Sequence, residues 1–206
     1  GEGETGPNTG GMGVIAPDPT MPAETLEKIL ETIAKPTLAG IRSEGIDYRG
    51  ILYIGLMLTD EGPKVLEFNV RLGDPETQLI LPLFQEDTVE VFIAAAEGNP
   101  LPQNLTPTGD SAIAIVLAAD GYPGSYDKGI QIQVPGSLPE GVSVIHAGTR
   151  LETAGNLVTS GGRVLNIVSI ADTAEEASDR AYAACRHTYF QKQYYRRDIG
   201  MTVPAT

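Results

Sequence analysis

Apolar residues at helical spacing predict two helices in the first half of the chain. One is expected over 22–35, and its core-facing stripe is Leu26, Ile29, Leu30 and Ile33. The other is expected over 87–97, with a capping-box pattern at Asp87 and Glu90, a stop at Gly98, and a buried stripe of Val89, Phe92, Ile93 and Ala96.

Two apolar runs over 50–58 and 64–72 alternate with period two, and the polar turn between them predicts an antiparallel hairpin. Successive side chains of a strand point to opposite faces. One face of the second strand is therefore expected to be apolar and to hold Leu66, Phe68 and Val70. The other face would present a carboxylate, an amide and a guanidinium in one row, from Glu67, Asn69 and Arg71.

Beyond residue 110 the pattern changes to β-rich runs separated by Gly and Pro. Strands are predicted over 111–119, 129–134, 142–147, 157–159 and 163–170. A capping-box pattern at Thr173 and Glu176 predicts one closing helix that runs to about Phe190. A mainly antiparallel sheet packed by a helix is typical of an α+β domain, and the Pro-rich segment 99–110 is the predicted boundary before it.

Charge and cysteine content narrow the classes of function. The 206 residues include 14 Lys or Arg and 27 Asp or Glu, and the net charge of −13 opposes binding to nucleic acid or to an anionic membrane. Neither a membrane-spanning run nor a signal peptide is visible. The single cysteine, Cys185, falls in a predicted helix, so a buried structural thiol and a reducing cytoplasm are expected.

The other titratable side chains with recognisable spacing indicate no chemistry. His146 lies in an apolar strand and is expected to be structural, with no metal-ligand spacing around it. The stretch from Arg180 to Arg197 contains basic residues but no acid between these two. A solvated helix face is the default interpretation of that stretch, and a phosphate contact is the alternative. In a complete protein this basic end could face the acidic part of the chain or a missing domain.

The polar face of the predicted strand 64–72 carries the main chemical signal. Hard oxygen ligands at i and i+2, as in Glu67 and Asn69, suit Mg²⁺, which otherwise keeps water or substrate phosphate. Arg71 can clamp a phosphate or a carboxylate. Alternation alone favours an ordinary solvated strand face, but the GDPE turn that follows and the glycine loop upstream favour a site for phosphoryl chemistry.

The upstream loop GPNTGGMG, residues 6–13, is too rich in Gly and Pro for a helix or a packed strand. Its backbone N–H groups could approach a ligand closely, and Asn8 and Thr9 add side-chain hydrogen bonds. It fits neither of the standard nucleotide-loop motifs. The loop is interpreted as an anion or substrate cradle, with a flexible connection as the alternative.

Six strings, taken in order, resemble the phosphoribosylamine–glycine ligase family of ATP-grasp enzymes. They are GPNTGGMG, YRGILYIGLML, VLEFNVRLGDPETQ, AADGYPGSYDKG, SGGRVL and RRDIG. The resemblance implies an α+β fold. Residues 1–98 would be the C-terminal part of an ATP-grasp catalytic domain, built as an antiparallel sheet with helices. A linker over 99–110 and a smaller β-rich α+β domain over 111–206 would follow. The chain departs from the family over 13–19, where an aromatic and a hydroxyl side chain are lost, and at Leu72, which precedes GDPE.

The resemblance implies a reaction and roles for residues. Glycine would be activated by ATP to glycyl phosphate and attacked by 5-phosphoribosylamine, which gives glycinamide ribonucleotide, ADP and phosphate in purine biosynthesis. Mg²⁺ or Mn²⁺ would be held by Glu67 and Asn69, and Arg71 would be catalytic. The substrate-binding candidates are Asn8, Thr9, Gly10, Gly11, Asp74 and Pro75. Asp74 can equally be interpreted as a turn residue, and for Glu76 the turn interpretation is favoured.

The family's N-terminal half, which supplies much of the grip on ATP, is absent from these residues, so this chain is expected to be truncated and inactive alone. That missing half is the expected protein partner, beside the small molecules ATP, glycine and 5-phosphoribosylamine. Two alternatives stay open: a folded fragment without catalysis, and an ATP-grasp ligase for another acid and amine.

Overall fold

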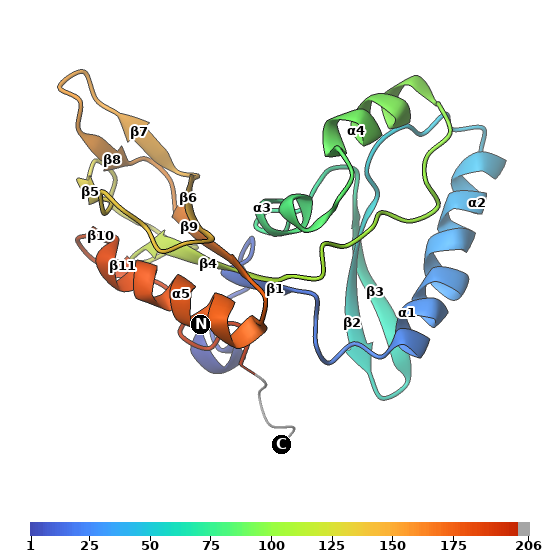
Figure 1. Ribbon diagram of the computed structural model, residues 1–206, viewed down its shortest axis with the longest axis horizontal. Coiled ribbons are helices and arrows are strands. Elements are labelled where there is room, and N and C mark those ends of the chain that lie inside the picture. The colour runs from blue at the N-terminus through green and yellow to red at the C-terminus, as the bar shows by residue number, and fades with distance from the viewer. Residues whose placement is uncertain (202–206) are drawn as a thin grey trace. The chain divides into compact units, whose positions relative to one another are not determined.

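The computed structural model describes residues 1–201, which form two compact units (Figure 1). Unit 1 contains Gly1–Pro17, Asp74–Leu83 and the described residues from Pro107 onward, and unit 2 contains Asp18–Gly73 and Phe84–Thr106. Each unit is thus assembled from separate stretches of chain, whereas the predicted domains 1–98 and 111–206 are contiguous. The predicted boundary between these domains at 99–110 stays a prediction. The last five residues of the predicted range 111–206 lie outside the described residues.

An antiparallel sheet is the centre of unit 1. Its strands lie in the order β1 (Gly13–Ala16), β4 (Ser111–Ala119), β9 (Arg163–Ala171) and β6 (Val142–His146), and β11 (Gln193–Tyr194) also pairs with β4. Two small pairs complete the strands of the unit: β5 (Ile132–Gln133) with β10 (Tyr189–Phe190), and β7 (Thr149–Leu151) with β8 (Leu157–Thr159). The α+β prediction is confirmed, and β1, β7, β10 and β11 are additions to it.

Helical segments cover both faces of this sheet. A short 3-10 turn, η1 (Glu2–Glu4), also belongs to unit 1. Helix α5 (Ala174–His187) packs on the face that includes Ile113, Ile115 and Leu117 (Figure 1). Helix α3 (Thr77–Ile80) and the 3-10 turn η3 (Leu81–Leu83) lie on the other face, whose cluster is Leu79, Leu83, Ala112, Ala114 and Val168. Strand β4 is therefore buried on both sides.

Cys185 of α5 has no exposed surface, and burial raises the pKa of its thiol to about 12. The thiolate that would act as a nucleophile is thus strongly disfavoured. The expectation of a structural thiol is confirmed.

A long helical stretch and a hairpin form most of unit 2. The stretch consists of α1 (Ala23–Ile29), the π-helical segment η2 (Leu30–Ala34) and α2 (Lys35–Ser43). The predicted end at residue 35 is wrong, because Pro36 sits in the first turn of α2, where a missing N–H is tolerated. The hairpin of β2 (Tyr53–Thr59) and β3 (Gly62–Asn69) is antiparallel, as predicted.

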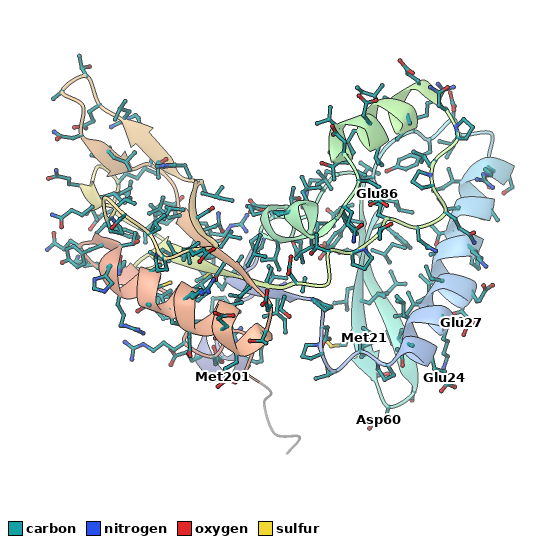
Figure 2. All side chains as sticks on the ribbon, viewed as in Figure 1. Met21, Glu24, Glu27, Asp60, Glu86 and Met201 are labelled. Atoms are coloured by element: carbon teal, nitrogen blue, oxygen red, sulfur yellow. The ribbon has the colours of Figure 1, made fainter. Side chains whose placement is uncertain are left out.

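Helix α4 (Thr88–Glu97) completes unit 2, and its predicted ends are confirmed. Asp87 caps it by accepting a hydrogen bond from the Val89 N–H, and Gly98 ends it in the left-handed conformation. Glu86, just before the cap, accepts hydrogen bonds from the hydroxyl and the N–H of Thr106, which lower the pKa of its carboxyl (Figure 2).

The predicted burial of apolar stripes in unit 2 is wrong. Of the first stripe only Ile29 is buried, and α4 has no buried residue. The strand face of Leu66, Phe68 and Val70 is exposed as well, with Val70 at 74%. A two-stranded sheet with few helices offers too little packing surface to cover all of these faces. No helix within residues 1–201 is long and apolar enough to cross a membrane.

Candidate functional site

Glu67 and Asn69 point to the same side of β3, as period-two alternation requires. The Asn69 amide nitrogen donates to Glu67 Oε1 over 3.0 Å. Opposite Glu67 lies Gly55, where a β-carbon would come within 3.1 Å of Glu67 Cγ, so glycine leaves space for the glutamate side chain. The carboxylate and the amide oxygen thus form a pair of hard oxygen donors on a rigid strand.

Two details of the predicted strand differ from the structure. A β-bulge between Gly55 and Leu56 places Glu67 opposite Gly55 but Val65 opposite Leu56, so Leu66 is the extra residue. The strand also ends at Asn69, and Arg71 therefore lies beyond it, with its guanidinium donating to the Leu72 carbonyl at 2.9 Å. The predicted row of three side chains is a row of two followed by an exposed arginine.

Backbone N–H groups of the glycine loop in unit 1 donate hydrogen bonds to side chains of the protein. The Gly10 N–H donates to the Tyr122 hydroxyl at 3.3 Å, and the Gly11 N–H donates to Thr9 Oγ1 at 3.2 Å. The Asn8 carboxamide oxygen accepts the Thr9 N–H at 3.1 Å. These two glycine N–H groups are engaged within the protein, so in this conformation the loop can offer a ligand the amide nitrogen of Asn8 and the hydroxyl hydrogen of Thr9.

Because Gly10 and Gly11 have no side chain, the Arg163 guanidinium and the Pro75 ring can pack closely against them. A β-carbon on Gly10 would lie 3.2 Å from the Arg163 guanidinium carbon, and one on Gly11 would lie 2.7 Å from Pro75 Cδ. Gly11 also has φ of +105°, a conformation that side chains rarely adopt. The substrate-binding candidates Gly10, Gly11 and Pro75 are thereby brought together.

Arg163, at the start of β9, joins the loop to the GDPE turn. One terminal nitrogen donates to the carbonyls of Gly10 and Asp74, both at 2.7 Å, and approaches the Gly11 carbonyl at 3.5 Å. The other pairs with Asp74 Oδ2 at 2.9 Å. Gln78 donates to the second carboxylate oxygen of Asp74 at 2.8 Å. Sequence reasoning did not single out Arg163; the arginine in SGGRVL, directly after two glycines, was the available signal.

A second arginine holds the segment before the loop. Arg196 pairs with Asp198 at 2.8 Å and with Glu4 at 2.5 Å, and the Gly3 N–H donates to Asp198 at 2.7 Å. Arg196, aided by this Gly3 bond, holds the pKa of the Asp198 carboxyl well below its usual range. The expectation that this basic end could face the acidic part of the chain is met by Arg196 through its ion pair with Glu4.

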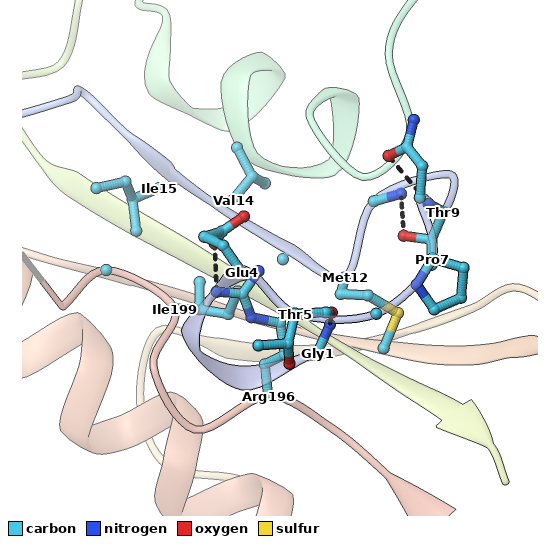
Figure 3. Close-up of a pocket in the computed structure, with 15 residues that line it drawn as sticks. Gly1, Glu4, Thr5, Pro7, Thr9, Met12, Val14, Ile15, Arg196 and Ile199 are labelled. Atoms are coloured by element: carbon cyan, nitrogen blue, oxygen red, sulfur yellow. Dashed lines mark hydrogen bonds and ion pairs between the residues drawn. The ribbon is translucent and has the colours of Figure 1, made fainter. Parts of the chain in front are cut away.

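The glycine loop and the segment held by Arg196 line a cavity of about 540 Å³ in unit 1 (Figure 3). Asn8, Thr9 and Gly11 lie along it, as do Glu4 and Arg196. The Arg196 guanidinium is already matched by two carboxylates, so this arginine offers the cavity no unpaired charge.

Metal-ligand and histidine chemistry are limited in the described residues. Residues 1–201 contain no group of three or more His, Cys, Asp and Glu side chains that could hold a metal. The Glu67 and Asn69 pair is a different kind of donor set, since its second ligand is an amide. His146 is exposed on β6 and shares a 3.1 Å hydrogen bond with the Thr149 hydroxyl.

A domain match over the first part of the chain places it among the ATP-grasp proteins. Residues 1–77 match the ATP-grasp (A) domain of phosphoribosylglycinamide synthetase, and residues 112–202 match the C domain of that synthetase. The two domains follow one another in this chain and cover most of it. The chain belongs to the phosphoribosylglycinamide synthetase family.

Relatives agree along nearly the whole chain. A phosphoribosylamine–glycine ligase from Caldanaerobacter subterraneus is 48% identical over 199 residues, which are 97% of this chain and 47% of that protein. One from Nostoc is 45% identical over 98% of this chain and 48% of the relative. The chain spans about half the length of these curated relatives.

Solved structures show the same fold. The crystal structure of phosphoribosylamine–glycine ligase from Thermotoga maritima superposes with a TM-score of 0.85 at 43% identity, covering 97% of this chain and 49% of that one. A biotin carboxylase domain of a thermophilic 2-oxoglutarate carboxylase shares the fold at 20% identity, with a TM-score of 0.63 over 89% of this chain and 41% of its own.

Proposed function

We propose that this chain serves the ATP-dependent ligation of glycine to 5-phosphoribosylamine, which proceeds through glycyl phosphate and gives glycinamide ribonucleotide, ADP and phosphate. The observation that carries the proposal is the 48% identity to a phosphoribosylamine–glycine ligase over 97% of the chain. The pair of Glu67 and Asn69 supports it, because phosphoryl transfer depends mostly on positioning and charge stabilisation.

The donor set of β3 fits a magnesium ion. Glu67 offers an exposed carboxylate, and Asn69 offers an amide oxygen while its nitrogen is turned to Glu67. Two protein oxygens are enough for Mg²⁺, which keeps water and substrate phosphate as its other ligands, and Mn²⁺ tolerates the same donors. When bound, the ion would neutralise charge on ATP phosphate oxygens. One fold neighbour, a biotin carboxylase domain from Hydrogenobacter thermophilus at 19% identity, contains MgADP.

The chain's own residues divide the remaining work. Arg71, exposed next to the metal-ligand candidates, would contact the transferred phosphoryl group or the glycine carboxylate. Asn8 and Thr9 would hold glycine or the ribosyl phosphate by their side chains, while Gly10, Gly11, Asp74 and Pro75 shape that part of the site. The engagement of Gly10 and Gly11 within the protein supports a shaping role for these two.

Turnover is proposed to require the half of the protein that the relatives carry in addition. The curated ligases are about twice the length that this chain spans. A grasp that excludes water from ATP needs a second lobe over the nucleotide. We expect the partner to be that half, with ATP, glycine and 5-phosphoribosylamine as the small molecules, and a cytoplasmic location. The alternative is a folded fragment without catalysis, and we expect the 206-residue chain to behave in this way when it is assayed alone.

The test is ADP release by a fusion of this chain behind the N-terminal half of the Caldanaerobacter relative. We expect release that depends on both glycine and phosphoribosylamine from the fusion and none from the chain alone. Replacing glycine by other small amino acids tests the alternative of a different ATP-grasp ligase. Equal release with another acid and amine would contradict the proposal, as would a folded fusion that releases no ADP.

A further inference from the structure

Arg163 is the point at which three distant stretches of unit 1 meet. It belongs to β9, yet its guanidinium binds the loop at Gly10 and the turn at Asp74, residues that precede it by 153 and 89 positions. The side chain is 22% exposed, so little of its hydrogen-bonding capacity is directed to water. One arginine side chain thus joins the loop and the turn to strand β9 of the sheet in unit 1.

We propose that Arg163 is a positioning residue that holds the glycine loop against the Asp74–Pro75 turn and thereby sets the affinity of the site for glycine and the sugar phosphate. The proposal rests on the proposed ligase function for the identity of these substrates. It goes beyond that function by assigning the position of the substrate-binding candidates in unit 1 to an arginine of strand β9.

The shape of the guanidinium explains why arginine suits this position. Its planar fork places several N–H donors in fixed directions, whereas a lysine ammonium is a point charge on a flexible stem. Here one nitrogen serves the carbonyls of Gly10 and Asp74, and the other serves the Asp74 carboxylate. Gly10 leaves room for the group, since a β-carbon there would lie 3.2 Å from its central carbon.

Removal of the Arg163 guanidinium should move the glycine loop without unfolding the sheet of unit 1. Arg163 sits at the first residue of β9, and the core of unit 1 is formed by apolar side chains of β4, β9 and α5. The loop residues held by the fork are followed by Met12 and β1, so a shift at Gly10 moves Thr9 and Asn8. A displacement of about 1 Å is enough to weaken binding strongly.

The first experiment measures amide hydrogen exchange in the 206-residue chain and needs no activity. Arg163→Met should accelerate exchange in the peptides that contain residues 9–12 and 74–78 about tenfold, because these segments lose charge-assisted hydrogen bonds. Arg163→Lys should be intermediate. Arg150→Met is the control, since Arg150 is exposed and its ion pair with Glu152 spans 3.6 Å.

The second experiment compares KM values in the fusion with the N-terminal half of the Caldanaerobacter relative. Arg163→Met should raise KM for glycine or phosphoribosylamine about tenfold or more and leave KM for ATP within about twofold. Arg163→Lys should recover part of the loss. A purely structural role would instead lower the amount of folded enzyme and leave every KM unchanged.

Each outcome decides the proposal. Unchanged exchange at 9–12 and 74–78 would overturn it, and Arg163→Lys provides this measurement if the Met variant fails to fold. Faster exchange with an equal rise of all three KM values, or with none, would also overturn it. A wild-type fusion without ADP release would contradict the ligase function instead, while the exchange result would still show whether Arg163 holds the loop.

Discussion

Glu67 and Asn69 show how two positions on one strand can create a chemical environment. Their side chains meet because they are two residues apart in β3, and Gly55 on the neighbouring strand leaves the space that the glutamate side chain occupies. Nothing in the local fold depends on the negative charge of Glu67, which is exposed. A change confined to that charge therefore separates chemistry from stability.

We predict that Glu67→Gln in the fusion lowers the rate of ADP release by about 100-fold or more, because the substitution removes the only negatively charged ligand of the proposed magnesium pair. The melting temperature should stay within about 2 °C of the unsubstituted fusion. Glu61→Gln is the matched control, since Glu61 is an exposed carboxylate in the turn of the same hairpin, paired with Lys64 at 3.0 Å. Equal rates in the two variants at limiting Mg²⁺ would remove Glu67 from the metal site.

Asp198 provides a prediction about pH at the same scale. Its pKa is depressed in the folded chain by Arg196 and Gly3, so its contribution to stability is present above its unfolded pKa of about 4. That contribution is lost as pH falls below about 4 toward the folded pKa. Asp198→Asn should destabilise the chain by about 1–2 kcal/mol at pH 7.

The check on Asp198 is urea unfolding at several pH values. The difference between wild type and Asp198→Asn should be constant from about pH 5 to pH 8 and shrink below about pH 4. Asp127→Asn is the control, because Asp127 is exposed and its pair with Lys192 spans 3.7 Å. A difference that grows on acidification would contradict this assignment.

At the scale of elements, helix α4 is defined by its ends more than by burial. It has no buried residue, so the cap by Asp87 and the left-handed Gly98 carry an unusual share of its stability. We predict that Asp87→Ala destabilises unit 2 by about 1 kcal/mol, because the Val89 N–H loses its partner.

Unfolding of the chain followed by circular dichroism checks the role of this cap. Asp60→Ala serves as the control, since Asp60 is an exposed acid in the hairpin turn and lies outside α4 (Figure 2). The midpoint should shift for Asp87→Ala alone. Equal midpoints for the two variants would show that the cap contributes nothing measurable.

Elements with a local signal could be predicted from the sequence. The caps at Asp87 and Thr173, the hairpin and the long strands β4 and β9 all follow from residues that are close in sequence. Strand β1 could not be predicted in this way, because its four residues follow a glycine-rich loop and become a strand only by pairing with β4. The burial of apolar stripes also escaped prediction, since it depends on which elements cover them.

The site shows the same division. Glu67, Asn69 and Asp74 stand in one recognisable string, and the Glu67 and Asn69 contact follows from strand geometry. The string SGGRVL marks Arg163 but does not reveal its role, because its partners Gly10 and Asp74 become its neighbours only through the fold. Whether these residues bind the proposed substrates stays a prediction that the fusion experiments address.

At the scale of the molecule, unit 1 is not a contiguous stretch of chain. Its sheet includes β1 from the start, and one of its faces is covered by α3 and η3 from the middle. We predict that a fragment of residues 107–201 aggregates or exposes apolar surface, because the edge of β4 and the face around Val168 lose their cover.

Dye binding and light scattering of that fragment test the interdependence. Adding a peptide of residues 1–17 and one of residues 74–83 should reduce dye binding if the three stretches reassemble. A fragment 107–201 that is monomeric and unfolds cooperatively without them would contradict the assignment of these stretches to one unit.

The interleaved construction of unit 1 also sets an order in time. A ribosome produces the loop at residues 6–13 long before Arg163 and Arg196, which hold that loop and the segment before it. Until Arg163 has emerged, the carbonyls of Gly10 and Asp74 lack the guanidinium that joins them. If the proposed function is correct, a nascent chain should hold no substrate, and the ability to bind glycine should arise only when the sheet of unit 1 is nearly complete.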